Sequence, residues 1–161
     1  MNRRLLIGLL GASLGNRAQR RRNSLIGVWK LQSCRRNFTD GHAELPFGEK
    51  PVGRIQYDRS GRMSAMLMRP GRRSILPPGI QLDHATDEEL RDAVSGFVAY
   101  FGTFDVDLPN QTVIHHVQAS LAPAWVGADL KRNFRFERGS LVLTRQATGV
   151  VDTLIWVRES D

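Results

Sequence analysis

The sequence predicts an all-β protein, a closed antiparallel barrel of eight strands with one inserted helix. Short runs of alternating or β-branched residues recur along the chain, and turn-forming residues separate them. A single segment breaks this period of two with a helical pattern. Eight strands suffice to close a barrel, whose interior is either filled by side chains or holds one small ligand.

The predicted strands are separated by residues that favour tight turns. The segments Asp58-Arg59-Ser60-Gly61 and Arg138-Gly139 are examples, because Gly, Asn and Asp accept the backbone conformations that hairpin turns require. The strands are expected at residues 25–38, 51–58, 62–69, 100–107, 112–121, 130–137, 141–146 and 153–158.

The inserted helix is predicted in the middle of the chain. Thr86 is followed three residues later by Glu89, which is the capping-box pattern, and acidic residues fill the first turn. Apolar residues then recur at helical spacing, which predicts about four turns. These residues are Leu90, Ala93, Val94, Phe97, Val98 and Phe101. The preceding stretch, 69–83, is rich in Pro and Gly and is either a lid over one barrel end or a solvated connector.

Composition indicates one ordinary globular domain. The 161 residues are 41% hydrophobic and 24% charged, which excludes disordered and collagen-like classes. The net charge of +7 comes almost entirely from six arginines before residue 23, leaving 17 basic residues to face all 16 acidic ones. The body is therefore nearly neutral, and we expect no nucleic-acid partner.

Residues 1–23 are expected to form a basic leader or signal-like segment, followed by the barrel domain at 24–161. Arg3-Arg4 and the short apolar run after them resemble a twin-arginine export signal. The run is too short to span a bilayer, and the arginines that follow it oppose translocation. Localisation therefore stays open between the cytoplasm and export, and no integral membrane segment is expected.

The alternation of the strands predicts which side chains point into the barrel. An interior built from them would select an apolar or aromatic molecule unless side chains fill it. They are Trp29, Leu31, Ile55, Tyr57, Met63, Leu67, Phe104, Val106, Phe134, Phe136, Leu141, Leu143, Leu154 and Trp156.

Cysteine and histidine usage argues against a metal centre. Cys34 is the only cysteine, so no intrachain disulfide can form, and we expect a small half-buried strand residue there instead of a nucleophile. His115 and His116 are adjacent in a strand and point to opposite faces, so they cannot chelate one ion together. We therefore expect neither a metal nor another cofactor.

Several motifs carry a resemblance to a known family. Gly27-x-Trp29 begins the first strand and Trp156-x-Arg158 ends the last. With the segments between them, they resemble the bacterial and fungal lipocalin-like domain family over nearly all of 25–158. Those segments are 51–58 (PVGRIQYD), 61–70 (GRMSAMLMRP), 97–103 (FVAYFGT) and 115–127 (HHVQASLAPAWVG).

The resemblance implies a calycin-type barrel with a small-molecule role. It also implies that Trp29 packs near Arg158 to close the barrel base, a cation–π contact worth about 0.5 to 2 kcal/mol. The chain departs from the family where Ala122 and Ala124 replace the usual asparagines. That departure weakens any catalytic role for amides in this loop.

His115 is the central candidate site residue. The apolar face of its strand, which includes Val113, Val117, Ala119 and Leu121, places it inside the barrel. It could orient a ligand carbonyl, act as a general base with Tyr57 or Tyr100, or fix the core through a hydrogen bond to a neighbour. The predicted ligand-binding residues are Arg54, Tyr57, Met63, Leu67, Phe104, His115, Phe134 and Phe136.

Three functions remain open at this level. The first is noncatalytic binding of a small hydrophobic or aromatic molecule. The second is a cofactor-free isomerase or cyclase acting on a polyketide-like or other hydrophobic metabolite, with His115, Tyr57 and Tyr100 as catalytic residues. The third is a structural or partner-binding protein with a filled barrel. The oligomeric state is not predicted.

Overall fold

The computed structural model describes residues 23–72 and 85–159. The predicted leader, apart from Asn23, and most of the predicted loop at 69–83 lie outside the described residues. Among the described helices, none combines the length and apolar character needed to cross a lipid bilayer.

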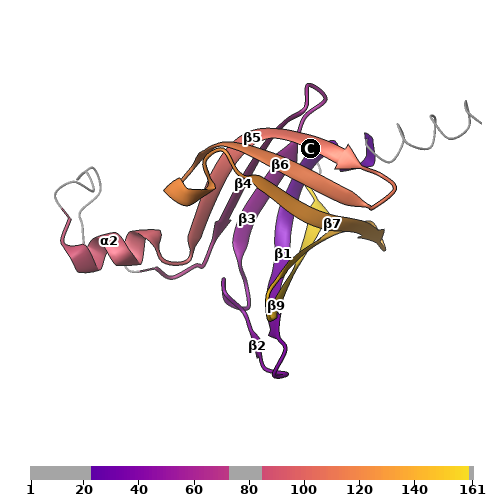
Figure 1. The fold of residues 1–161 in the computed structure, drawn as a ribbon. Helices are drawn as coiled ribbons and strands as arrows, with labels where there is room; N and C mark the ends of the chain where they lie inside the picture. The colour runs from indigo at the N-terminus through magenta and orange to yellow at the C-terminus, as the bar shows by residue number, and fades with distance from the viewer. Residues whose placement is uncertain (1–22, 73–84, 160–161) are drawn as a thin grey trace, which may run out of the picture.

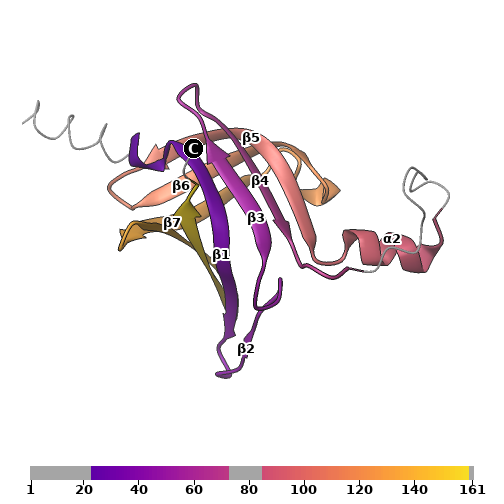
Figure 2. The same cartoon turned by 180° about the vertical axis from the view of Figure 1, so that it is seen from behind.

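The described residues form the predicted closed, eight-stranded antiparallel barrel (Figures 1 and 2). In the ring, β1 pairs with β3, each later strand pairs with the next in sequence, and β9 pairs with β1 to close the barrel. A short strand, β2, pairs with Arg36 and Asn37 near the end of β1 and was not predicted. The elements are β1 Gly27–Phe38, β2 Ala43–Glu44, β3 Val52–Tyr57, β4 Arg62–Met68, α2 Asp87–Val94, β5 Phe97–Asp107, β6 Thr112–Ser120, β7 Asp129–Glu137, β8 Ser140–Ala147 and β9 Val150–Arg158.

Helix α2 begins as predicted but ends earlier. Thr86 Oγ1 accepts a hydrogen bond from the Glu89 amide, and Glu89 Oε2 accepts one from the Thr86 amide at 2.7 Å, which confirms the capping box. The helix stops before Gly96, where φ is +72°. Phe97 instead pairs with Met68 in the sheet, because the backbone ladder of β4 and β5 outweighs the helical spacing of the apolar residues. None of the helix residues is buried, and α2 projects from the barrel wall (Figure 1).

Two bulges change which residues face inward. The register of β1 against β9 shifts between Leu31 and Ser33, and the residues that follow turn Cys34 and Arg36 toward the interior. The register of β5 against β6 shifts between Phe101 and Gly102. Beyond that second bulge Leu121 is 40% exposed, so its predicted inward orientation is wrong.

Of the fourteen side chains predicted to face inward, eleven are buried. Val106 and Leu154 are half-buried and pack against the core. Phe136 is the exception at 39% exposed, because it lies at the end of β7, where its ring contacts Trp29. The prediction that Phe136 lies in the interior is therefore wrong.

The base of the barrel is closed by the predicted contact between Trp29 and Arg158. The guanidinium carbon of Arg158 lies 4.2 Å from the Trp29 ring centroid. Its two terminal nitrogens donate to the carbonyl oxygens of Ile26 and Ser24, at 2.9 and 2.8 Å. The Trp29 indole donates to the Leu25 carbonyl. These bonds tie the segment before β1 to the end of β9.

Candidate functional site

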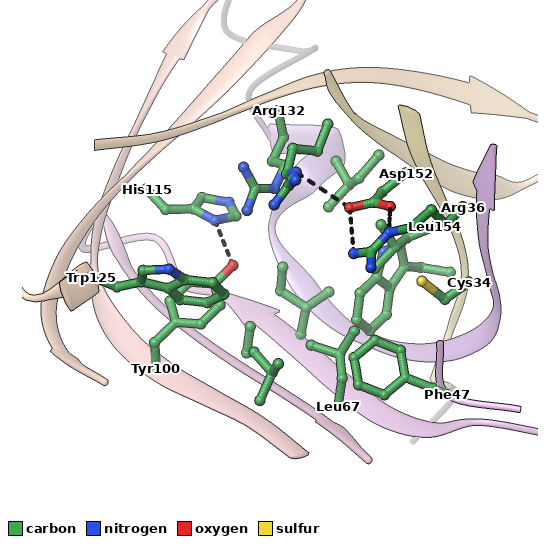
Figure 3. A pocket seen from close by; sticks show the side chains of 16 residues that line it. Cys34, Arg36, Phe47, Leu67, Tyr100, His115, Trp125, Arg132, Asp152 and Leu154 are labelled. Carbon is green, nitrogen blue, oxygen red and sulfur yellow. Dashed lines mark hydrogen bonds and ion pairs between the residues drawn. The ribbon is translucent and has the colours of Figure 1, made fainter. Parts of the chain in front are cut away.

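The barrel interior holds a cavity of about 200 Å³ (Figure 3). One part of its wall is polar and is built by Tyr100, His115 and a group of charged side chains. The rest is mostly apolar and aromatic. The apolar lining consists of Phe47, Ile55, Ala65, Leu67, Val98, Trp125, Leu143, Leu154 and Trp156. The interior is therefore not filled by side chains.

His115 is fully buried and lies between two tyrosines from neighbouring strands, so the inward orientation predicted for it is confirmed. Tyr57 Oη on β3 lies 2.8 Å from His115 Nε2, and Tyr100 Oη on β5 lies 3.0 Å from Nδ1. Burial, with help from the nearby Arg132 charge, lowers the pKa of His115 to about 3. Burial also raises the pKa of both tyrosines. All three groups are therefore neutral at pH 7.

The hydrogen bonds assign the histidine tautomer. His115 is the one hydrogen-bond partner that the described residues offer the Tyr57 hydroxyl. A buried hydroxyl proton needs an acceptor, so Tyr57 donates to Nε2. The proton of the neutral ring is then on Nδ1, which donates to Tyr100 Oη. This arrangement leaves the Tyr100 hydroxyl proton free to donate into the cavity, which Tyr100 lines.

A charged cluster forms another part of the wall. Asp152 on β9 pairs across the sheet with Arg36 on β1 and with Arg145 on β8. Its carboxylate accepts two hydrogen bonds from Arg36, at 2.7 and 3.2 Å. Arg145 Nε lies 3.3 Å from Asp152 Oδ2, an ion pair without hydrogen-bond geometry. One carboxylate therefore serves two guanidinium groups (Figure 3).

Arg132 is a third arginine of the lining. It occupies the inward position of β7 between Leu130 and Phe134, and it pairs with Val113, two residues from His115. Figure 3 places it between His115 and Asp152. Its Nη1 donates to the Lys131 carbonyl oxygen at 2.8 Å. Among the described residues, no carboxylate forms an ion pair with it.

Cys34 is buried in β1 beside this cluster. Burial and the Asp152 carboxylate raise the pKa of its thiol to about 11. The thiol is therefore protonated at pH 7 and a poor nucleophile. Within the described part of the chain, no group of three or more His, Cys, Asp or Glu side chains is placed to hold a metal ion.

Of the predicted site residues, Leu67, Tyr100 and His115 line the cavity. Tyr57 does not line the cavity, but it is hydrogen-bonded to His115, which does. Arg54 lies outside the barrel in an ion pair with Glu159. Met63, Phe104, Phe134 and Phe136 do not line the cavity. A ligand contact by any predicted residue stays a prediction.

Sequence reasoning missed most of the polar wall and the aromatic contact beside it. Trp125 follows Pro123 in a short 3₁₀ turn, and its ring packs edge-on against Tyr100, with centroids 5.8 Å apart. Arg132 could have been found, since it interrupts the apolar face between Leu130 and Phe134. The missed lining residues are Cys34, Arg36, Phe47, Ala65, Val98, Trp125, Arg132, Arg145 and Asp152.

His116 lies on the outer face, as the alternation predicts, between two carboxylates. Its Nδ1 lies 2.6 Å from Asp129 and its Nε2 lies 3.1 Å from Asp105. The hydrogen bond to Asp129, supported by Asp105, raises its pKa. When protonated, the ring bridges three neighbouring strands, β5, β6 and β7.

Loss of this bridge is expected as the pH rises. Because the folded-state pKa of His116 is raised, its contribution is complete below about pH 6.5 and disappears as the pH passes through the folded value. Solvent exposure keeps the effect below about 1 kcal/mol. In urea unfolding, the stability advantage of the unmodified protein over His116→Gln should be smaller at pH 9 than at pH 6; the His115 contribution is common to both proteins and cancels. An advantage that does not change with pH would exclude the bridge as a source of stability.

These features define a closed antiparallel barrel with a hollow interior, the architecture in which lipocalins hold one small ligand. Residues 26–155 match the model of the lipocalin-like domain family, and the chain belongs to this family. It is also similar to the 4'-hydroxy-3'-methoxypropiophenone carrier protein ppsC of Aspergillus oryzae. The two are 40% identical over 76 residues, which cover 44% of this chain and 67% of the fungal protein.

Proposed function

We propose that this protein binds one small aromatic molecule in the barrel cavity without transforming it. The observation that carries the proposal is the size and character of the cavity, about 200 Å³ with a mostly apolar and aromatic wall. An engineered apolar cavity of about 150 Å³ accommodates benzene. The interior therefore has room for one substituted aromatic ring, which could pack against Trp125 and Leu67.

The fungal relative supports a carrier function. Its name describes a carrier of 4'-hydroxy-3'-methoxypropiophenone, which is an aromatic ketone with a phenolic hydroxyl group. A molecule of this class has a flat apolar body and oxygen atoms that accept hydrogen bonds. The Tyr100 hydroxyl, whose proton is not used in its bond with His115, is suited to donate a hydrogen bond to such an oxygen.

The state of His115 favours binding over the cofactor-free isomerase or cyclase. Both of its ring nitrogens are engaged by tyrosine hydroxyls. A general base works best when its pKa lies near the working pH, and the pKa of His115 is about 3. In the proposed function, His115 orients Tyr100 instead of removing a substrate proton.

Isothermal titration calorimetry with 4'-hydroxy-3'-methoxypropiophenone tests the proposal. Leu67 faces the cavity, whereas its neighbour Met66 points outward and is 45% exposed. Leu67→Trp should fill the cavity and weaken binding more than tenfold, while Met66→Trp should leave the affinity unchanged. Absence of binding by the unmodified protein to this ketone and to other substituted benzenes would refute the proposal. If NMR shows that the bound ketone is converted to a product, the cofactor-free isomerase or cyclase is favoured instead.

A further inference from the structure

The charges of the described cavity wall do not balance. Arg36, Arg132 and Arg145 contribute three guanidinium groups, and Asp152 contributes one carboxylate. Arginine stays protonated in proteins, so the lining has two positive charges in excess. The side chains of Arg36 and Arg145 are 33% and 34% exposed, so these charges are only partly removed from water. Even partly desolvated charges are stabilised by pairing, and this excess therefore favours a negatively charged partner.

The wall also has more unused hydrogen-bond donors than acceptors. Arg132 makes its described hydrogen bond to a backbone carbonyl and has further donors. The Tyr100 hydroxyl proton is left free by its bond from His115 Nδ1. Trp156 Nε1 is buried and has no hydrogen-bond partner among the described residues. The one carboxylate of the lining is already shared by Arg36 and Arg145.

Arg132 and Tyr100 line the same cavity, and both lie beside His115 (Figure 3). Each influences the titration of the other, since the Arg132 charge favours the ionised form of the Tyr100 phenol. The Arg132 charge also helps to lower the pKa of His115, which favours the neutral form of the ring. A negatively charged oxygen placed here would be stabilised by a guanidinium group and a hydroxyl donor together.

We propose that the polar wall formed by Arg132 and Tyr100 is a subsite for an anionic oxygen of the ligand. The ligand is then an aromatic acid, either a carboxylate or an ionised phenol, whose ring packs on the apolar wall. This inference rests on the proposed function, because it assigns one end of the ligand that the cavity binds. The Arg36–Asp152–Arg145 cluster holds the neighbouring wall in place and adds to the positive potential.

Binding of matched ligands to the purified full-length protein tests this inference. The probes are 3-phenylpropionate and its neutral analogue 3-phenylpropionamide, which share one ring and one side-chain length. Calorimetry should show about tenfold or more tighter binding of the anion, as expected for a hydrogen bond to a charged group. Arg132→Gln should abolish this preference, because the acid loses much more affinity than the amide when the guanidinium charge is removed. Arg135→Gln, an outward substitution on the same strand, should keep the preference.

Binding of 4-nitrophenol tests whether the anionic oxygen belongs to a phenolate or to a carboxylate. The ionisation of this phenol is visible in its absorbance. If the subsite accepts phenolates, the bound molecule should be ionised at a pH where the free molecule is mostly neutral. If the bound phenol stays neutral and 3-phenylpropionate binds tightly, the site takes carboxylates. Both results support the inference.

The inference and the proposed function fail in different ways. Equal affinity for the acid and the amide would overturn the anionic subsite and keep the binding function. A preference for the acid that persists in Arg132→Gln would also overturn the assignment to Arg132. No binding of any probe or of the aromatic ketone would overturn the binding function itself. Circular dichroism of each variant establishes that the barrel is folded.

Discussion

Acidification from pH 6.5 to pH 5 is expected to lower the free energy of unfolding by about 2 kcal/mol through His115 alone. The folded-state pKa of His115 is about 3, far below its ordinary value of 6.5. Over this interval the unfolded chain takes up a proton and the folded chain does not. Stability is therefore complete above pH 6.5 and decreases by about 1.4 kcal/mol for each pH unit below it.

Urea unfolding of the unmodified protein and of His115→Gln checks this prediction. The variant should be less stable at pH 7, because it disturbs the bonds of Tyr57 and Tyr100, but its stability should change less between pH 6.5 and pH 5. NMR of the unmodified protein supplies a second measurement. The His115 ring signals should stay constant over this interval. Titration of His115 above pH 5 would refute the buried neutral state. The His116 contribution does not interfere, since it changes above pH 6.5.

Replacement of Gly102 by alanine is expected to destabilise the barrel by about 3 kcal/mol or more. A Cβ atom at this position would lie 1.9 Å from the His116 carbonyl oxygen and 3.0 Å from the Gln118 amide nitrogen. Both are backbone atoms of β6, so no side chain can rotate away from the clash. The strands would have to separate at the bulge between Tyr100 and His115, and ligand binding should weaken as well.

Gly53→Ala is the matched control for this substitution. Its Cβ atom would lie 2.9 Å from the Met66 carbonyl oxygen and 3.0 Å from the Leu31 side chain, a milder contact. We expect a loss of about 1 kcal/mol for Gly53→Ala. The urea midpoint of Gly102→Ala, which has the shorter contact, should therefore be lower than that of Gly53→Ala. A Gly102→Ala protein as stable as Gly53→Ala would contradict the close packing at the bulge.

The positions of the strands and the inward orientation of His115 could be predicted because both follow from local alternation. Alternation continues only as far as the pairing is regular. The bulge in β1 therefore hid Arg36 and Cys34, and the bulge beside Gly102 made the predicted orientation of Leu121 wrong. The helix was overextended for a related reason. Phe97 and Phe101 fit a helical spacing, but strand pairing with β4 was the stronger interaction.

The candidate site could be predicted only in part. Tyr57 and Tyr100 were expected as partners of His115, and both bond to it. Arg54 was expected there too, but its strand position points it outward, toward Glu159. The cluster around Asp152 joins strands that are far apart in the sequence. Its members could not be grouped before the ring of strands was closed.

The sequence by itself determined the all-β barrel, the base closed by Trp29 and Arg158, and a histidine in the interior. The barrel and the interior histidine depend on local periodicity, and the contact between Trp29 and Arg158 was implied by the resemblance to the lipocalin-like family. Only the tertiary structure decided that the interior is hollow and that Arg132 and Tyr100 line the same cavity as the cluster around Asp152. Both depend on side chains from different strands, whose relative positions are set by the register and the bulges of the closed sheet.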